Sequence, residues 1–353
     1  MRIGKKVIDH IEKCYAVAEF IYKEQQYLLC SAEGKGPCRM YTPDGAIKET
    51  LWDGPGGVMT LLQLPDPPVP VLLATQCFFS PDDAKNGKIV YYYPREGQWY
   101  CETLCEMPFI HRFGVIGNRN EKYLIAATLK SDCSYNGDWS SPGKIWTAKL
   151  PENIFQYNKN HPLKFSPLIS GLYKNHGFSI NEEGETSYAV IGTDNGVYSI
   201  FSPIQRGGEW EYKKILEEPA SDILLRDFDN DGEKELLIIS PFHGQKIKIY
   251  KRNSRGRFES VYQRDKDLPF AHAIWGGKIG EKEYAFLGGR DGNKELIAIF
   301  YDHEKGVYEE KLIDKEAGAA NCMLFYVKGE AKLLAANRES DEVAIYDLSE
   351  KFK

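Results

Sequence analysis

AHAIWGG, at residues 271–277, begins the stretch that decides the fold; YAFLGG at 284–289, ELIAIFYD at 295–302 and VYEEKLI at 307–313 follow it. Each piece is short, alternates apolar with polar residues or is wholly apolar, and is rich in β-branched and aromatic side chains. The intervening turns, RDGNK and HEKG, carry the Gly, Asp and Asn that tight hairpins need. The spacing predicts four successive antiparallel strands.

This four-strand pattern recurs about every fifty residues, most clearly in its second strand. The second strands begin near Tyr27, Val71, Tyr123, Tyr188, Leu236, Tyr284 and Leu333. Seven such units account for residues 1–353 as a single domain. The last unit lacks a fourth strand, which the N-terminal segment at about 5–13 can supply, so that no sheet edge stays exposed. The sequence therefore predicts an all-β, seven-bladed β-propeller closed by its N-terminal strand.

One position of the repeat gathers three of the seven histidines. It lies twelve residues before each second strand, or fourteen in the fifth unit, and should face the axis of the ring. The residues there are Tyr15, Met59, His111, His176, Asp222, His272 and Asn321. Imidazole and carboxylate ligands suit Zn²⁺, Mn²⁺, Fe²⁺ or Ni²⁺. We expect a transition-metal site formed by His111, His176, His272 and Asp222. Two alternatives are histidines that plug the channel by bonding to backbone, and a polar ring that binds an anionic ligand without metal.

The loops between second and third strands open on the same face as this ring and should form one funnel with it. They contain His243, in PFHG, our first candidate for a general acid or base. A surface turn histidine is the alternative. Tyr135 and Lys130 belong to the long third-unit loop around 131–143, which could cover the funnel. Tyr135 is therefore a second acid/base candidate.

Two arginines of these loops complete the candidate catalytic set. Arg290 and Arg338 could bind a carboxylate or an oxyanion, because a guanidinium is a planar, permanently charged donor. Either could instead pair with Asp291 or Glu339 nearby.

The sequence DFDNDGEKE at 227–235 resembles a loop that binds a hard cation. Its oxygen ligands would be Asp227, Asp229, Asp231 and Glu235, with Gly232 at the bend. Because this loop joins first and second strands, it should lie on the face opposite the funnel. Structural Ca²⁺ is the expected ion, and a polar turn without a metal is the alternative.

Composition narrows the classes of partner. With 45 basic and 51 acidic residues the net charge is −6, and no basic block suggests nucleic acid or an anionic membrane. The N-terminus lacks the features of a signal peptide, and no apolar run is long enough to span a membrane. Eight cysteines without a CxxC motif indicate reduced thiols in a cytoplasmic protein. Oligomeric state is left open.

LLRDFDNDGEKELLI at 224–238 resembles the FG-GAP or VCBS-type repeat of integrin-like propellers. HRFG at His111, HGFS at His176 and AHAIWGG at His272 resemble the propeller part of the fungal aldos-2-ulose dehydratase group. The plan is also similar to that of oligogalacturonate lyases. These resemblances imply a propeller with axial histidines on a metal, acting on 1,5-anhydrofructose, related keto sugars or uronates. The cupin-like part of the dehydratase has no counterpart here, which leaves substrate and reaction open.

Together these patterns predict a metal-dependent carbohydrate lyase or dehydratase that performs β-elimination on a small sugar. Hydrolysis or epimerisation would use the same groups. The competing hypothesis is a non-enzymatic propeller that binds a small ligand or a protein partner through its funnel. The repeated WD and GH signatures of adaptor propellers are missing from the sequence, which disfavours an adaptor.

Overall fold

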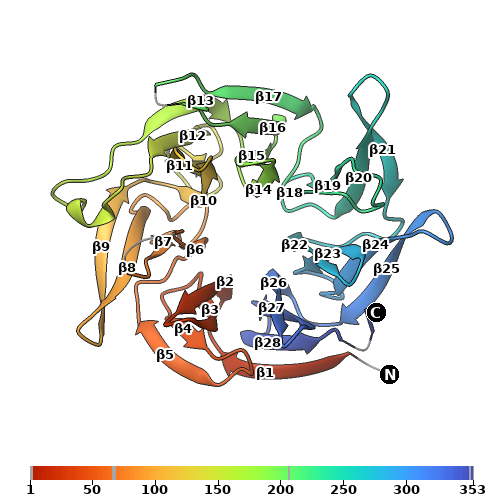
Figure 1. The fold of residues 1–353 in the computed structure, drawn as a ribbon, viewed down its shortest axis with the longest axis horizontal. Coiled ribbons are helices and arrows are strands. Elements are labelled where there is room, and N and C mark those ends of the chain that lie inside the picture. The colour runs from red at the N-terminus through yellow and green to blue at the C-terminus, as the bar shows by residue number, and fades with distance from the viewer. Residues whose placement is uncertain (1–2, 66–68, 206, 350, 353) are drawn as a thin grey trace.

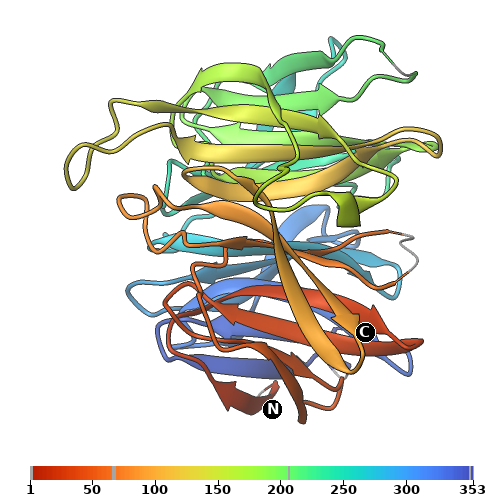
Figure 2. The ribbon, with the colours of Figure 1, turned by 90° about the vertical axis from the view of Figure 1, so that its left-hand side faces the viewer.

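A computed structural model describes residues 3–65, 69–205, 207–349 and 351–352. The described strands form seven four-stranded antiparallel blades around the central axis of a β-propeller (Figure 1). Five blades are separate sheets, and two neighbouring blades are joined into one eight-stranded sheet by the residue pair Gly117 and Ser187. In Figure 2, loops extend from both faces of the ring. The predicted fold class is confirmed.

The first three blades are regular meanders. Blade 1 contains β2 (Cys14–Tyr22), β3 (Gln25–Ala32), β4 (Cys38–Tyr41) and β5 (Ile47–Trp52); blade 2 contains β6 (Leu61–Gln63), β7 (Leu72–Gln76), β8 (Lys88–Arg95) and β9 (Gln98–Glu106). Blade 3 contains β10 (Ile110–Gly117), β11 (Lys122–Lys130), β12 (Pro142–Lys149) and β13 (Ser166–Leu172), with the 3₁₀ turn η1 (Ile154–Gln156) before β13.

The remaining blades follow the same plan. Blade 4 contains β14 (Gly177–Glu183), β15 (Thr186–Thr193), β16 (Gly196–Phe201) and β17 (Glu211–Leu216); blade 5 contains β18 (Asp222–Arg226), β19 (Glu235–Ser240), β20 (Lys246–Arg252) and β21 (Phe258–Gln263). Blade 6 contains β22 (Ala271–Ile279), β23 (Lys282–Gly289), β24 (Leu296–Asp302) and β25 (Val307–Asp314); blade 7 contains β26 (Ala319–Val327), β27 (Glu330–Asn337), β28 (Glu342–Asp347) and β1 (Gly4–His10).

The N-terminal strand closes the ring, as the sequence predicts, although it spans Gly4–His10 rather than 5–13. β1 runs antiparallel to β28, from the pair Gly4 and Asp347 to the pair His10 and Glu342. The two ends of the chain therefore meet in one sheet (Figure 1). This pairing covers the edge of β28 that the last repeat leaves open.

The second strands are apolar because neighbouring blades cover both of their faces. Every residue of β7 and β19 is buried, and so are the last six residues of β3. Their side chains form the clusters between adjacent blades, one of which joins Leu237 and Ile239 to Ala285 and Leu287 of the next blade. The core therefore lies between the sheets, and the axis is left for other side chains.

The same backbone feature, a β-bulge preceded by a left-handed residue, occurs at the axial position of the repeat in two blades. His111 and His272 are the extra residues of β-bulges in β10 and β22, and each follows by two positions a residue in the left-handed conformation. Those residues are Phe109, with φ of 60°, and Phe270, with φ of 49°. A bulge re-aims a side chain without ending the strand, which here presents both imidazoles to the axis.

In blade 7 the prediction of Asn321 at this position was wrong by one residue. The bulge lies at Ala320, between Ala319 and Asn321, and the left-handed residue two positions before it is Gly318. The apolar run starting at Leu333 begins one position later in its strand than its counterparts in other blades. Asn321 instead donates its side-chain N–H to Tyr15 O, at 3.0 Å.

Gly143, in β12, lies very close to the backbone of the neighbouring strand β11 in blade 3. A Cβ atom at this position would lie 1.9 Å from Thr128 O. We expect Gly143→Ala to lower the free energy of unfolding by about 3 kcal/mol, because backbone must move to relieve the overlap. Chemical denaturation measures this change. Gly4→Ala is the control, since its Cβ would make an ordinary 3.7 Å contact with Asp347. Equal effects of the two variants would contradict the prediction.

Among the described residues, no helix is long and apolar enough to cross a membrane. All eight cysteines belong to this described part and are free thiols, and only Cys101 is exposed while Cys77 is partly buried.

Candidate metal centre

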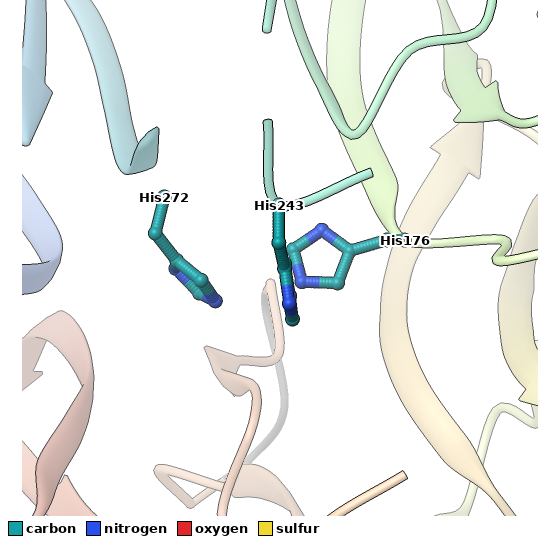
Figure 3. Close-up of side chains that lie close together, drawn as sticks. All are labelled: His176, His243 and His272. Atoms are coloured by element: carbon teal, nitrogen blue, oxygen red, sulfur yellow. The ribbon is translucent and has the colours of Figure 1, made fainter. Parts of the chain in front are cut away.

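Three histidines from three loops or strand ends meet near the axis (Figure 3). His176 directly precedes β14, His272 is the second residue of β22, and His243 lies between β19 and β20. One ring nitrogen from each lies within 4.8 Å of the other two. His176 and His272 are only 1% and 2% exposed, whereas His243 is partly exposed. His243 is therefore the member nearest solvent.

Backbone carbonyls fix the orientation of the two buried imidazoles. His272 Nδ1 lies 2.8 Å from Ala320 O, and His176 Nδ1 lies 3.0 Å from Ser221 O. A carbonyl oxygen only accepts, so each Nδ1 must carry the proton and each Nε2 must carry a lone pair. Metal-binding histidines are commonly oriented in this way.

The two lone pairs have different surroundings. His176 Nε2 is buried and has no hydrogen-bond partner among the described residues. His272 Nε2 lies 3.2 Å from the Tyr15 hydroxyl, which must donate to it. Asp222 Oδ2 is 3.0 Å from His176 Nδ1 but makes no hydrogen bond with described residues, because that N–H faces Ser221 O. Asp222 therefore lies behind His176, on the side away from its lone pair.

His243 is held by its own loop. Its backbone is left-handed, with φ of 49°, and its N–H donates to Ser221 Oγ at 3.1 Å. The imidazole stacks on Phe242, with ring centroids 3.9 Å apart, and lies 4.6 Å from the Phe270 ring. The sequence predicts His243 as an acid or base, and the structure brings it into the group of three.

His111 lies beside this group without joining it. Its ring is 4.4 Å from that of His176 and 5.0 Å from that of Phe78. His111 Nδ1 is buried and lacks a partner in the described chain. Of the four residues predicted as ligands, His176 and His272 have nitrogens in the cluster, while His111 and Asp222 flank His176.

The surroundings favour the neutral form of His111, His243 and His272. Burial is the main cause that lowers the pKa of His111 and His272 well below 6.5, with further lowering from His176 for the first and Arg290 for the second. Burial, then His176 and Arg290, lower the pKa of His243 to about 2. Neutral imidazole is the form that binds a metal.

Arg290 and Arg338 are engaged by carboxylates. Arg290 pairs with Glu339 at 2.8 Å, and its guanidinium lies 4.4 Å from the centre of the Phe270 ring. Arg338 pairs with Glu339 at 2.9 Å and with Glu33. The pairing with Glu339 is the alternative that the sequence left open for both.

The loop that contains Tyr135 closes on itself. Lys130 is buried, with its ammonium 2.9 Å from Asp82 and 4.2 Å from the centre of the Trp139 ring. The Tyr135 side chain is 66% exposed and has no described contact with the histidines. Trp139 is the residue of this loop that approaches the site, since its ring lies 5.3 Å from that of Phe242.

The four predicted calcium ligands cluster as expected, but a lysine lies among them. Lys251 Nζ is 2.6 Å from Asp231 and 3.2 Å from Glu235, and it also contacts Asp229. Burial raises the pKa of Glu235 to about 7. A calcium ion at this place would have to displace the ammonium that already balances the carboxylates.

A cavity lies at the other end of the axis. It has a volume of about 990 Å³ and is lined by apolar residues of the inner strands, including Phe178, Trp275 and Leu324. Its rim includes Arg119 and Glu185, which belong to turns between first and second strands. The histidines lie at the opposite ends of those strands. The predicted single funnel therefore does not coincide with this cavity.

Two further residues at the axis were missed as functional candidates. Tyr15 occupies the ring position of blade 1, but nothing in its neighbourhood in the sequence indicates a bond to His272. Arg112 follows His111 in the HRFG motif, and the β-bulge between Ile110 and Arg112 changes the direction of the strand there. Only the fold brings these residues beside the histidines.

Comparisons with known proteins support the fold. No family model matches the chain, and no curated protein matches it in sequence. The structure of BBS1N in complex with ARL6DN is similar over 100% of this chain and 99% of that one, with a TM-score of 0.60 and 11% identity. The Cps50 (Swd1) propeller domain of Myceliophteria thermophila is similar over 98% and 99%, with a TM-score of 0.60 and 13% identity. This protein is thus of the β-propeller class.

Proposed function

We propose that this propeller binds one divalent transition metal through His176, His243 and His272 and is a carbon–oxygen lyase acting on a small carbohydrate. The convergence of three imidazole nitrogens within 4.8 Å of one another carries the proposal. Three histidines that leave one position open are typical of a catalytic zinc site.

The donor set fits a metal for three reasons. Zinc bonds imidazole nitrogen at roughly 2.0–2.1 Å, so the three nitrogens need only small rotations to share one ion. His176 Nε2 is a buried lone pair without a partner among the described residues, which is costly unless it binds something. The carbonyls at Ser221 and Ala320 hold two of the rings so that the lone pair is available.

The residues around the centre suggest how an elimination would proceed. A bound metal would supply Lewis acidity to a carbonyl or carboxylate oxygen of the sugar. His111, with a neutral ring and an unpartnered Nδ1 in the described chain, would accept the α-proton. The Tyr15 hydroxyl, now bonded to His272 Nε2, would donate a proton to the departing oxygen. Asp222, with Oδ2 3.0 Å from His176 Nδ1, would place a negative charge behind that ring.

A second candidate is a propeller that binds a ligand or partner without catalysis. The 990 Å³ cavity on the opposite face favours it, because that cavity is large enough for a small molecule and does not include the histidines. This alternative predicts no metal in the protein and no effect of the three histidines on binding.

Metal analysis of the full chain, purified without chelators, tests the proposal. We expect about one equivalent of Zn²⁺ or another transition metal per chain in wild type, and a loss of most of it in His176→Ala/His272→Ala. The control is His10→Ala, which replaces an exposed histidine. His111→Ala distinguishes the ligand sets, because it should retain the metal if His243 is the third ligand.

If the metal is present, keto sugars and uronates should be screened for the ultraviolet absorbance of a conjugated elimination product. Wild type folded but metal-free after incubation with Zn²⁺, Mn²⁺, Fe²⁺ and Ni²⁺ would refute the metal centre. It would also make the ligand-binding propeller the better hypothesis.

A further inference from the structure

The cavity at the end of the axis opposite the histidines is built by the whole ring. Its volume is about 990 Å³, and the inner strand of every blade contributes to its wall: β2, β6, β10, β14, β18, β22 and β26 (Figure 1). Cavities that hold small molecules usually measure roughly 300–1,000 Å³. The space is therefore large enough to enclose a small organic molecule.

Two large apolar side chains of this wall are exposed. Ile180 is 37% and Trp275 is 39% exposed, although both line the cavity. Phe178 extends the same apolar surface and lies against a glycine of the next inner strand, because a Cβ atom at Gly114 would be 2.9 Å from Phe178 Cε1. Removing apolar surface from water is favourable, so an apolar molecule would bind here by covering these side chains.

The charges around the cavity balance one another. Arg119 pairs with Glu185 at 3.0 Å, and Arg226 lies 3.7 Å from Glu283. Among the described lining residues three are basic and three are acidic, and all six belong to turns or lie near strand ends at the rim: Arg119, Lys122, Arg226, Glu19, Glu182 and Glu185. An ionic ligand would therefore find no excess of opposite charge, and burying its charge in the apolar part would be costly.

One polar group of the wall is left for a ligand. The Trp275 side chain has a single N–H donor, which makes no hydrogen bond with a described residue of the chain. Other polar side chains of the wall are engaged, since Thr60 Oγ1 donates to His111 O at 3.0 Å and Ser187 Oγ accepts from Gly117 N at 3.0 Å. A ligand with a hydrogen-bond acceptor would satisfy the indole N–H.

We propose that this cavity is a second binding site, which takes an uncharged, mainly apolar small molecule with a hydrogen-bond acceptor, such as a planar ketone or ester. The apolar body would contact Phe178, Ile180 and Trp275, and the carbonyl oxygen would accept the indole N–H. A protein partner fits less well, because charged turns surround the opening and charged residues are depleted at the centre of protein interfaces. Binding here is independent of the proposed lyase activity, since the histidines lie at the opposite strand ends.

Fluorescence titration with prodan tests this proposal. Prodan is an uncharged naphthyl ketone whose emission moves to shorter wavelength in apolar surroundings. The full-length wild type should bind it at one saturable site. Anilinonaphthalene sulfonate, which is similar in size but anionic, should bind at least about tenfold more weakly, because its charge is costly to bury without a free cation.

Variants of the wall test the location of the site. Ile180→Asp should weaken prodan binding at least about tenfold, because it introduces a charge into the apolar wall. Trp275→Phe, which keeps an aromatic ring but loses the N–H, should weaken it about fivefold. Val261→Asp is the matched control, since Val261 is 50% exposed on β21 and does not line the cavity. Denaturation midpoints show that each variant is folded.

The outcomes separate this site from the metal centre. His176→Ala/His272→Ala should bind prodan as wild type does, and loss of binding in that folded variant would place the ligand at the histidines instead. Folded wild type without saturable prodan binding would overturn the proposal, and tighter binding of the sulfonate would overturn the uncharged class. Unchanged prodan affinity in both Ile180→Asp and Trp275→Phe would overturn the location. Metal content does not enter any of these results, so either proposal can fail while the other holds.

Discussion

Removal of residues 4–10 is expected to lower the free energy of unfolding by about 5 kcal/mol and to cause self-association. β1 pairs with β28 through six residue pairs, and each backbone hydrogen bond lost costs about 1 kcal/mol net. The deletion also removes Asp9, which lies 2.6 Å from Arg39. The unpaired edge of β28 would then be free to pair with another chain.

Chemical denaturation and size-exclusion chromatography measure the two effects. Lys6→Gln is the matched control, because it removes only the side-chain bond to Asp44 O and keeps the strand pairing. A synthetic peptide of residues 1–10 added to the truncated protein should restore part of the stability. A truncated protein that is as stable and monomeric as wild type would show that the ring does not depend on this closure.

Acidification of the metal-free protein from pH 7 to pH 5 is expected to remove much of its stability. His111, His243 and His272 have folded pKa values below the unfolded value of about 6.5. The unfolded chain therefore binds protons first as the pH falls. Their contribution is fully present above pH 6.5 and is lost below it, by about 1.4 kcal/mol per pH unit and per histidine, or about 2 kcal/mol for each at pH 5.

Comparison of variants separates the contribution of the histidines to this pH dependence from that of other titratable groups. Glu235 acts in the opposite direction, because its raised pKa of about 7 makes the folded chain take up a proton first. The stability lost between pH 7 and pH 5 should be about 2 kcal/mol smaller in His243→Gln than in wild type. His10→Gln should behave like wild type, because His10 is exposed. Identical pH dependence of His243→Gln and wild type would contradict the neutral, buried state of His243.

Residue patterns were sufficient to predict the propeller. The second strand of each blade is covered by blades on both sides and is therefore apolar. Apolar runs consequently recur in the sequence at a regular spacing. The N-terminal closure follows from the same regularity, since the last repeat is one strand short. The spacing also predicts that His176 and His272 lie close together, because both are at the start of an inner strand and inner strands surround the axis.

The composition of the histidine cluster was decided by tertiary structure. His243 enters it from a loop between β19 and β20, where a left-handed residue and a bond to Ser221 set its direction. Arg112 and Tyr15 come near each other from β10 and β2, which are separated by nearly a hundred residues of sequence. The one-residue error at Asn321 has a similar origin, because a β-bulge changes which side chain faces inward without changing the apolar pattern.

The sequence by itself determined the number of blades, the closure of the ring and the strand ends at which the axial residues would gather. Those features depend on the alternation of apolar and polar residues within strands and on the regular recurrence of buried strands. Both patterns can be recognised within each repeat separately. Only the tertiary structure decided which imidazoles meet and which nitrogen each presents. Those features depend on loop conformation, bulges and the pairing of residues from different blades, and no single repeat contains that information.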